Sequence, residues 1–89
     1  MSKLFIDGKA IEFMKNALEK ENLPAMRLFI SGGGCCKHFE LTPVKQALSG
    51  DVTFKQSGIT VHVEKELVDN TKTIEIIFDD TKGLTINFE

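Results

Sequence analysis

The sequence predicts a mainly β domain with one N-terminal amphipathic helix. Apolar residues have helical spacing between Asp7 and Asn22, they alternate with a period of two after Pro24, and glycine-containing turns separate the later stretches. The 89 residues fit one domain, so residues 1–89 are read as a single unit. This order of elements predicts an antiparallel sandwich or distorted barrel with the helix packed on it.

The predicted helix lies between Asp7 and Asn22. Asp7 is a suitable N-cap, and Asn22-Leu23-Pro24 provides the stop, because proline cannot continue a helix. Phe13 and Met14 are interpreted as core residues with no functional role. The apolar face repeats at intervals of three and four residues: Ile11, Met14, Ala17 and Leu18.

The alternation after Pro24 predicts a strand over residues 26–31, followed by a short strand over 39–42 that ends before Pro43. Residues 43–50 are expected to form a polar excursion with a helical turn. Ser57-Gly58 then joins two strands in a hairpin, and Leu67 and Val68 face inward from one helical turn. A last hairpin turns at 79–83. The predicted core includes Leu28, Ile30, Phe54, Val61, Ile76 and Ile86.

Charge and hydropathy narrow the class of partner. The net charge is -2, and lysine and arginine are mixed with acidic residues, so nucleic acid is not expected as a partner. No apolar run approaches the length of a membrane span or of a signal-peptide core, so we expect no membrane association and a cytoplasmic protein. Thiols stay reduced in that compartment, where two cysteines indicate metal binding or redox chemistry.

The most informative segment follows the first predicted strand. Gly32, Gly33 and Gly34 precede Cys35 and Cys36, which are the only cysteines of the chain. Glycines let a backbone approach a ligand closely, and a thiolate is a soft metal ligand and a nucleophile. The alternative is a packed, inert pair, since cysteine is often buried. Neighbouring side chains of an extended chain point to opposite faces, so burying both requires a covered loop.

Other chemistries fit this loop poorly. The P-loop and dinucleotide-binding patterns cannot be written across it. A cysteine nucleophile would need a positioned histidine, and His62 is expected to face solvent, so the protein is not expected to be an enzyme. His38 is a candidate accessory ligand. Structural zinc needs four ligands and one chain has no second pair, whereas an iron–sulfur cluster can take four thiolates from two chains.

The chain resembles the A-type iron–sulfur carriers, the HesB-like proteins. The resemblance is carried by residues 26–35, Met-Arg-Leu-Phe-Ile-Ser-Gly-Gly-Gly-Cys, by the hairpin over 51–63 and by the strand pair over 73–88. It implies a HesB-like fold and a non-enzymatic role in iron–sulfur cluster assembly. Proteins of this family hold iron or a [2Fe-2S] or [4Fe-4S] cluster between subunits and pass it to recipient proteins.

The resemblance also implies a ligand set, from which this sequence departs. Cys35 matches the loop cysteine of the family, but the sequence stops at Glu89 without the C-terminal Cys-Gly-Cys. Cys36 stands where typical carriers have a small polar residue, so it can replace part of the lost set. The chain is thus interpreted as a divergent carrier with Cys35 and Cys36 as metal ligands in a homodimer. The alternative is a thiol redox or interaction module that keeps the fold and binds no cluster.

Overall fold

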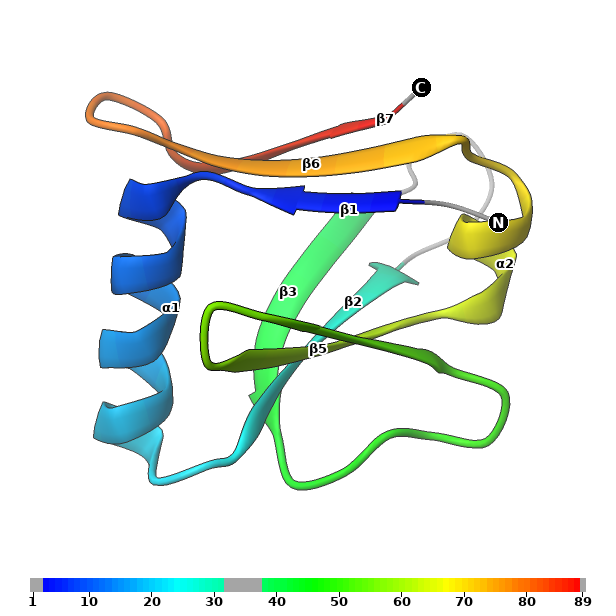
Figure 1. Cartoon of the computed structure of the whole chain (residues 1–89), viewed down its shortest axis with the longest axis horizontal. Coiled ribbons are helices and arrows are strands. Elements are labelled where there is room, and N and C mark those ends of the chain that lie inside the picture. Colours follow the sequence, from blue (N-terminus) through cyan, green and yellow to red (C-terminus); the bar gives the residue numbers. More distant parts are fainter. Residues whose placement is uncertain (1–2, 32–37, 89) are drawn as a thin grey trace.

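Strands make up most of the regular structure in the computed structural model, which describes residues 3–31 and 38–88. Helix α1 stands at one end of the strands in Figure 1 and the short helix α2 at the other. In chain order the elements are β1 (Lys3–Ile6), α1 (Gly8–Glu21), β2 (Ala25–Ser31), β3 (His38–Val44), β4 (Val52–Gln56), β5 (Ile59–Val63), α2 (Lys65–Asp69), β6 (Thr73–Asp79) and β7 (Gly83–Phe88).

The strands form two sheets, which confirms the predicted mainly β class. One sheet has the order β1-β6-β7 and the other the order β3-β2-β5-β4. Each sheet is mixed: β1 pairs with β6 in parallel, and β2 pairs with β5 in parallel, whereas the remaining pairs are antiparallel. The parallel pairs were not predicted, because local alternation of residues does not show which distant strand a segment will join.

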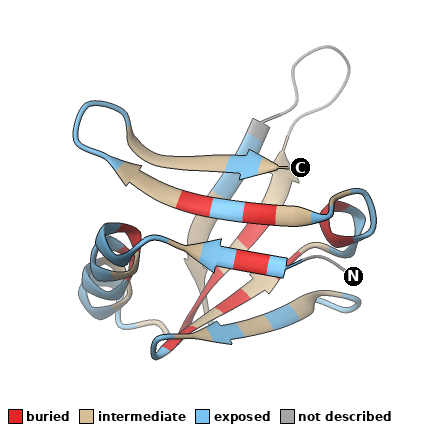
Figure 2. Ribbon diagram, turned by 45° about the horizontal axis from the view of Figure 1, so that its top comes forward, coloured by how far each residue is buried: buried red, intermediate tan, exposed pale blue. Residues whose placement is uncertain are grey.

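The core lies between the two sheets and under the inner sides of the helices (Figure 2). Leu28, Val61 and Ile76 are fully buried, as predicted. Ile30, Phe54 and Ile86 are only partly buried and pack around that core. Their positions explain the difference, because Phe54 and Ile86 lie on the edge strands β4 and β7 and Ile30 lies near the end of β2.

Helix α1 has the predicted limits. The amide of Ile11 donates to the carbonyl of Asp7, and Asn22 ends the helix in the left-handed conformation with φ of 55°. Met14 is fully buried, as expected of the apolar face. Phe13 is 45% exposed and packs its ring against Phe78, with centroids 5.2 Å apart. The interpretation of Phe13 as a core residue was therefore wrong, since it lies at the margin of the helix–sheet contact.

The segment around Pro43 differs from the prediction. Strand β3 continues through Pro43 to Val44, with Pro43 opposite Met26 of β2. An edge strand tolerates proline, because its outer side needs no ladder hydrogen bond. The expected helical turn after it is absent, and the Asp51 carboxylate instead accepts a hydrogen bond from the amide of Leu48 at 2.9 Å. Leu67 and Val68 of α2 are buried, as predicted.

The two predicted hairpins are confirmed. Between β4 and β5, Ser57 and Gly58 have φ values of 51° and 82°. Two successive positive φ values give the turn that matches the twist of paired strands. Between β6 and β7, Asp79 Oδ1 accepts hydrogen bonds from the amides of Thr81 and Lys82 at 2.7 and 3.1 Å, so a side chain closes the turn.

The free edge of β1 is covered by one side chain from the other sheet. The amides of Lys3 and Asp7 donate toward β6, so Leu4 and Ile6 present their backbone groups at the opposite edge. Gln56, at the end of β4, accepts from the Ile6 amide at 3.0 Å and donates to the Leu4 carbonyl at 3.4 Å. The carboxamide thus satisfies two groups of an edge strand and joins the two sheets.

We expect Gln56→Ala to lower the free energy of unfolding by about 1–2 kcal/mol, because it leaves a donor and an acceptor of β1 unpaired. Urea unfolding followed by circular dichroism measures the change. Gln46→Ala is the matched control, since Gln46 is an exposed residue of the segment between β3 and β4. Equal stabilities of the two variants would mean that Gln56 does not hold the edge.

Candidate functional site

The cysteine segment connects the ends of two paired strands. Ser31, the last residue of β2, lies opposite His38, the first residue of β3. The predicted ligands Cys35 and Cys36, and the loop residues Gly32, Gly33 and Gly34, lie outside the described residues. The backbone of His38 is described as part of β3. The described residues nearest to the cysteine segment along the chain are Ser31 and His38. The ends of β2 and β3 around these two residues are called the base of the cysteine segment.

An aromatic pair joins the two sheets at this base. The ring of Phe39, next to His38, lies 4.5 Å from the ring of Phe88, measured between centroids and with planes inclined by 42°. Phe39 is 46% exposed, which is a large fraction for phenylalanine. The contact brings the end of β7 to the start of β3. The alternating pattern predicted both strands but could not predict that these two residues meet.

The carboxylate of Glu64 lies at the same base, on the edge of β2 that faces β5 and not β3. Glu64, which follows β5, accepts a hydrogen bond from the amide of Ile30 through Oε2 at 3.0 Å. Ile30 directly precedes Ser31, the last residue before the cysteine segment. Glu64 was not predicted as a site residue, because its partner is 34 residues away and no local pattern indicates the pair.

His62 was expected to face solvent, but it is only partly exposed and has a hydrogen-bond partner on a neighbouring strand. It is half-buried, and its Nδ1 shares a hydrogen bond of 2.8 Å with the Thr53 hydroxyl on the neighbouring strand β4. In the parallel register His62 lies opposite Arg27, four residues before Ser31. Four residues of strand span roughly 13 Å, so the fold does not gather His62 at the base of the cysteine segment.

The strongest ion pair of the described residues joins Arg27 to Asp51. The guanidinium donates twice, from Nε to Oδ2 at 2.7 Å and from Nη2 to Oδ1 at 3.0 Å, and the side chains are 13% and 2% exposed. The hydrogen bond from Arg27 lowers the pKa of the Asp51 carboxyl, and the same bond raises the pKa of Arg27. Both charges are satisfied by each other, which indicates a structural role for the pair.

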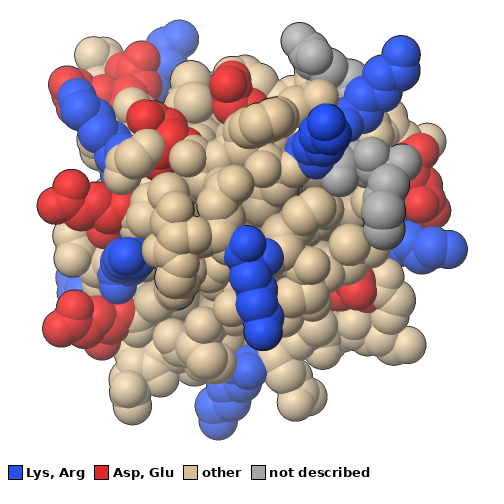
Figure 3. Space-filling view, in the orientation of Figure 1, with Lys and Arg blue, Asp and Glu red and all other residues tan. Residues whose placement is uncertain are grey.

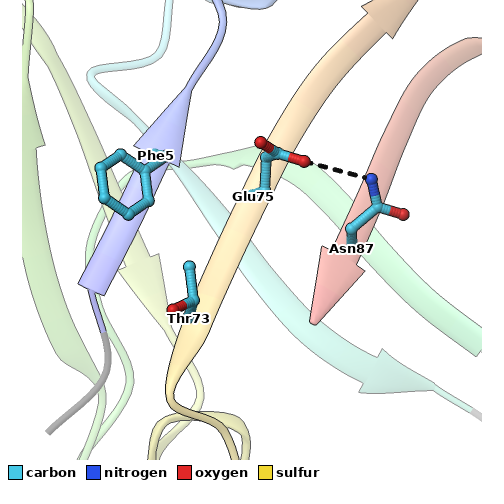
Figure 4. Close-up of a pocket in the computed structure, with 4 residues that line it drawn as sticks. All are labelled: Phe5, Thr73, Glu75 and Asn87. Atoms are coloured by element: carbon cyan, nitrogen blue, oxygen red, sulfur yellow. Dashed lines mark hydrogen bonds between the residues drawn. The ribbon is translucent and has the colours of Figure 1, made fainter. Parts of the chain in front are cut away.

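A shallow depression on the outer face of the sheet β1-β6-β7 has a volume of about 390 Å³. Figure 4 shows its lining residues Phe5, Thr73, Glu75 and Asn87, which come from three neighbouring strands. The Asn87 amide donates to the Glu75 carboxylate at 3.3 Å. These four residues include no thiol or imidazole, and the one carboxylate among them is hydrogen-bonded to Asn87.

The metal-binding side chains of the described residues define no second candidate site. Across residues 3–31 and 38–88, no group of three histidine, cysteine or acidic side chains is arranged to hold a metal ion. Figure 3 shows charged side chains of both signs spread over one face. Neither described helix is long and apolar enough to span a membrane.

The fold is similar to that of several solved structures. The structure of Escherichia coli SufA, involved in biosynthesis of iron–sulfur clusters, superposes with a TM-score of 0.75 over 97% of this chain and 78% of that chain, at 19% identity. IscA with the [2Fe-2S] cluster gives a TM-score of 0.69 over 98% and 84%, at 16% identity. A solution structure of a protein from Aquifex aeolicus gives 0.68 over 100% and 95%, at 20% identity.

No family model and no curated protein sequence matches the chain. The likeness is therefore one of fold, and it covers nearly the whole chain. The fold expected from the resemblance of residues 26–35, 51–63 and 73–88 is confirmed as an architecture shared with SufA and IscA. Sequence identities of 16–20% leave the function of this chain to be argued from its own residues.

Proposed function

We propose that this chain is a small non-enzymatic protein that binds iron or an iron–sulfur cluster between two subunits through Cys35 and Cys36. One observation carries the proposal: the only two cysteines of the sequence lie together in the connection between β2 and β3 of a fold similar to SufA and IscA. Thiolates are the usual ligands of iron–sulfur clusters, and adjacent thiols after three glycines form a compact donor set.

The number of sulfurs leads to the subunit arrangement. A cluster with four cysteine ligands needs four thiolates, and each chain has two, so two chains complete the set. Cys35 and Cys36 bind iron as thiolates, so each chain releases two thiol protons on binding. His38, the first residue of β3, is proposed as an accessory ligand. Gly32, Gly33 and Gly34 let the backbone approach the cluster.

We propose that the protein works in the cytoplasm, where reducing conditions keep both thiols available. In this role it receives iron or a cluster from a donor protein and passes it to a recipient. The similarity in fold to SufA, a protein involved in iron–sulfur cluster biosynthesis, supports this place in assembly.

Anaerobic purification and reconstitution with ferrous iron, sulfide and a thiol reductant test the proposal. We expect iron and acid-labile sulfide to remain bound after desalting, sulfide-to-iron absorption in the visible range, and a shift from monomer to dimer in size-exclusion chromatography with light scattering. A reconstituted wild-type protein without bound iron and without this absorption would overturn the carrier function.

A second function is favoured by the absence of any third cysteine from the sequence. A redox module needs only one reactive thiolate, which a peroxide oxidises to a sulfenic acid as the peroxide is reduced to water or an alcohol. A partner thiol then condenses with the sulfenic acid to a disulfide and releases water. Binding of no iron, together with rapid alkylation of one of the two cysteines, would support this second function.

A further inference from the structure

Strand β7 forms the outer edge of the sheet β1-β6-β7 (Figure 2). On the central strand β6, the Ile76 carbonyl accepts a hydrogen bond from the Asp7 amide at 2.9 Å, so the backbone groups of Ile76 face the side of β1. Ile86 lies opposite Ile76 in the antiparallel register, and its own backbone groups therefore face away from β6. The same alternation turns the backbone groups of Leu84 and Phe88 to this outer edge.

The three other edge strands carry features that hinder further pairing. Gln56 covers the edge of β1, Pro43 interrupts β3, and the exposed Lys55 places a charge on β4. Strand β7, with the sequence Gly-Leu-Thr-Ile-Asn-Phe, contains neither proline nor a charged residue. The sheet order places no described strand beyond it. Within the described residues, β7 is thus the edge best suited to receive another strand.

The pattern of β7 is complementary to itself. When two copies pair antiparallel about Ile86, this residue lies opposite the same residue of the second copy, and Leu84 lies opposite Phe88 of the second copy. These three side chains belong to the inner, partly buried face that packs against the core. On the outer face Thr85 lies opposite Asn87 of the second copy, so apolar residues meet apolar ones and polar residues meet polar ones.

We propose that two copies of this chain pair antiparallel through the outer edge of β7, so that two three-stranded sheets join into one sheet of six strands. A two-fold axis at Ile86 uses the one edge of each copy, so the assembly closes as a dimer. The inference goes beyond the proposed function, because it concerns β7 alone and holds for the iron-free protein.

The size of the contact sets its strength. Six residues from each copy bury less than the roughly 1,200 Å² of a stable complex, so we expect a dissociation constant on the order of 100 µM. The iron-free protein is then mainly monomeric at about 5 µM and mainly dimeric at about 1 mM. Cluster-dependent dimerisation is therefore measured at the lower concentration, where the pairing through β7 contributes little.

Two double variants that differ in one charge test the proposed register. Thr85→Glu/Asn87→Lys places opposite charges across the pair of strands twice, whereas Thr85→Lys/Asn87→Lys places like charges there. Sedimentation equilibrium of the iron-free, reduced full chain at low salt should give dissociation constants about threefold lower for the first variant and at least about tenfold higher for the second, relative to wild type. Circular dichroism checks that both variants keep the fold.

Hydrogen exchange by NMR tests the same edge in wild type. The amides of Leu84, Ile86 and Phe88 should exchange about threefold more slowly at about 1 mM than at about 50 µM, because the dimer protects them. The Leu41 amide is the control. Leu41 lies two residues before Pro43 and presents its backbone to the outer edge of β3, so its exchange rate should not depend on concentration.

Three results would overturn the pairing through β7. They are a wild-type monomer at about 1 mM, equal association of the two double variants, and slow exchange of the three β7 amides at both concentrations. The last result would mean that another segment of the chain covers this edge. Because every measurement uses iron-free protein, failure of wild type to take up iron would overturn the proposed function and leave the pairing through β7 supported by its own results.

Discussion

Replacing either Cys35 or Cys36 with serine is expected to abolish cluster binding. Each chain has two thiols, so a four-thiolate cluster between two subunits uses all of them, and each single variant leaves only two thiolates per dimer. A serine hydroxyl is a harder and much less acidic donor than a thiol, so it does not replace the lost ligand. Iron and sulfide analysis, the visible spectrum and light scattering after anaerobic reconstitution measure the loss of cluster and of the cluster-dependent dimer.

His38→Ala is the control within the same region, and we expect it to retain the cluster, because the imidazole is at most an accessory ligand. The two cysteine variants should keep the circular dichroism spectrum of wild type, which separates loss of the cluster from loss of the fold. Retention of full cluster binding by Cys36→Ser would show that only Cys35 binds metal. Selective loss of alkylation in one variant, without any bound iron in wild type, would indicate the redox function instead.

Breaking the pair between Arg27 and Asp51 is expected to have the largest effect on stability among single changes of charged side chains. Asp51→Ala leaves the guanidinium of Arg27 mostly buried and without its two acceptors, and the Leu48 amide also loses its partner. Removing one member of a buried pair typically lowers the free energy of unfolding by about 3–5 kcal/mol. That is a large share of the total for a domain of this size. Urea unfolding at pH 7 measures the change.

The matched control is Asp69→Ala in the exposed pair of Lys65 and Asp69, where the nitrogen–oxygen distance is 3.8 Å. Exposed pairs contribute about 0–1 kcal/mol, so this variant should unfold close to wild type. The double variant Arg27→Ala/Asp51→Ala should lose less than the sum of the two single variants, because it leaves no unpaired charge. Additive losses would contradict the assignment of the pair as one unit.

The same pair predicts a pH dependence. Arg27 lowers the pKa of Asp51 in the folded protein, so the unfolded chain takes up this proton at a higher pH than the folded chain does. The contribution of Asp51 to stability is therefore present above the unfolded pKa, near pH 4, and is lost as the pH falls through the lower folded pKa. The difference in unfolding free energy between wild type and Asp51→Ala should shrink below pH 4. A constant difference down to pH 2 would contradict this origin.

The local elements could be predicted because their signals lie within a few residues. Apolar spacing and the Asn22-Leu23-Pro24 stop predict α1, and Ser57-Gly58 predicts the hairpin of β4 and β5 through two positive φ values. The prediction failed at Pro43, because whether a strand tolerates proline depends on its place at the edge of a sheet. It also missed β1 as a strand, since four residues have too short a pattern and their partner β6 begins about 70 residues later.

The sequence by itself determined the mainly β class, the limits of α1, three of the six predicted core positions (Leu28, Val61 and Ile76) as fully buried, and the cysteine pair as the chemical feature of the chain. Only the tertiary structure decided which strands pair in parallel, that Arg27 meets Asp51, and that Phe88 and Glu64 lie at the base of the cysteine segment. The reason is physical: helical and strand periodicities arise from neighbours along the chain, whereas contacts between residues tens of positions apart depend on how the two sheets pack.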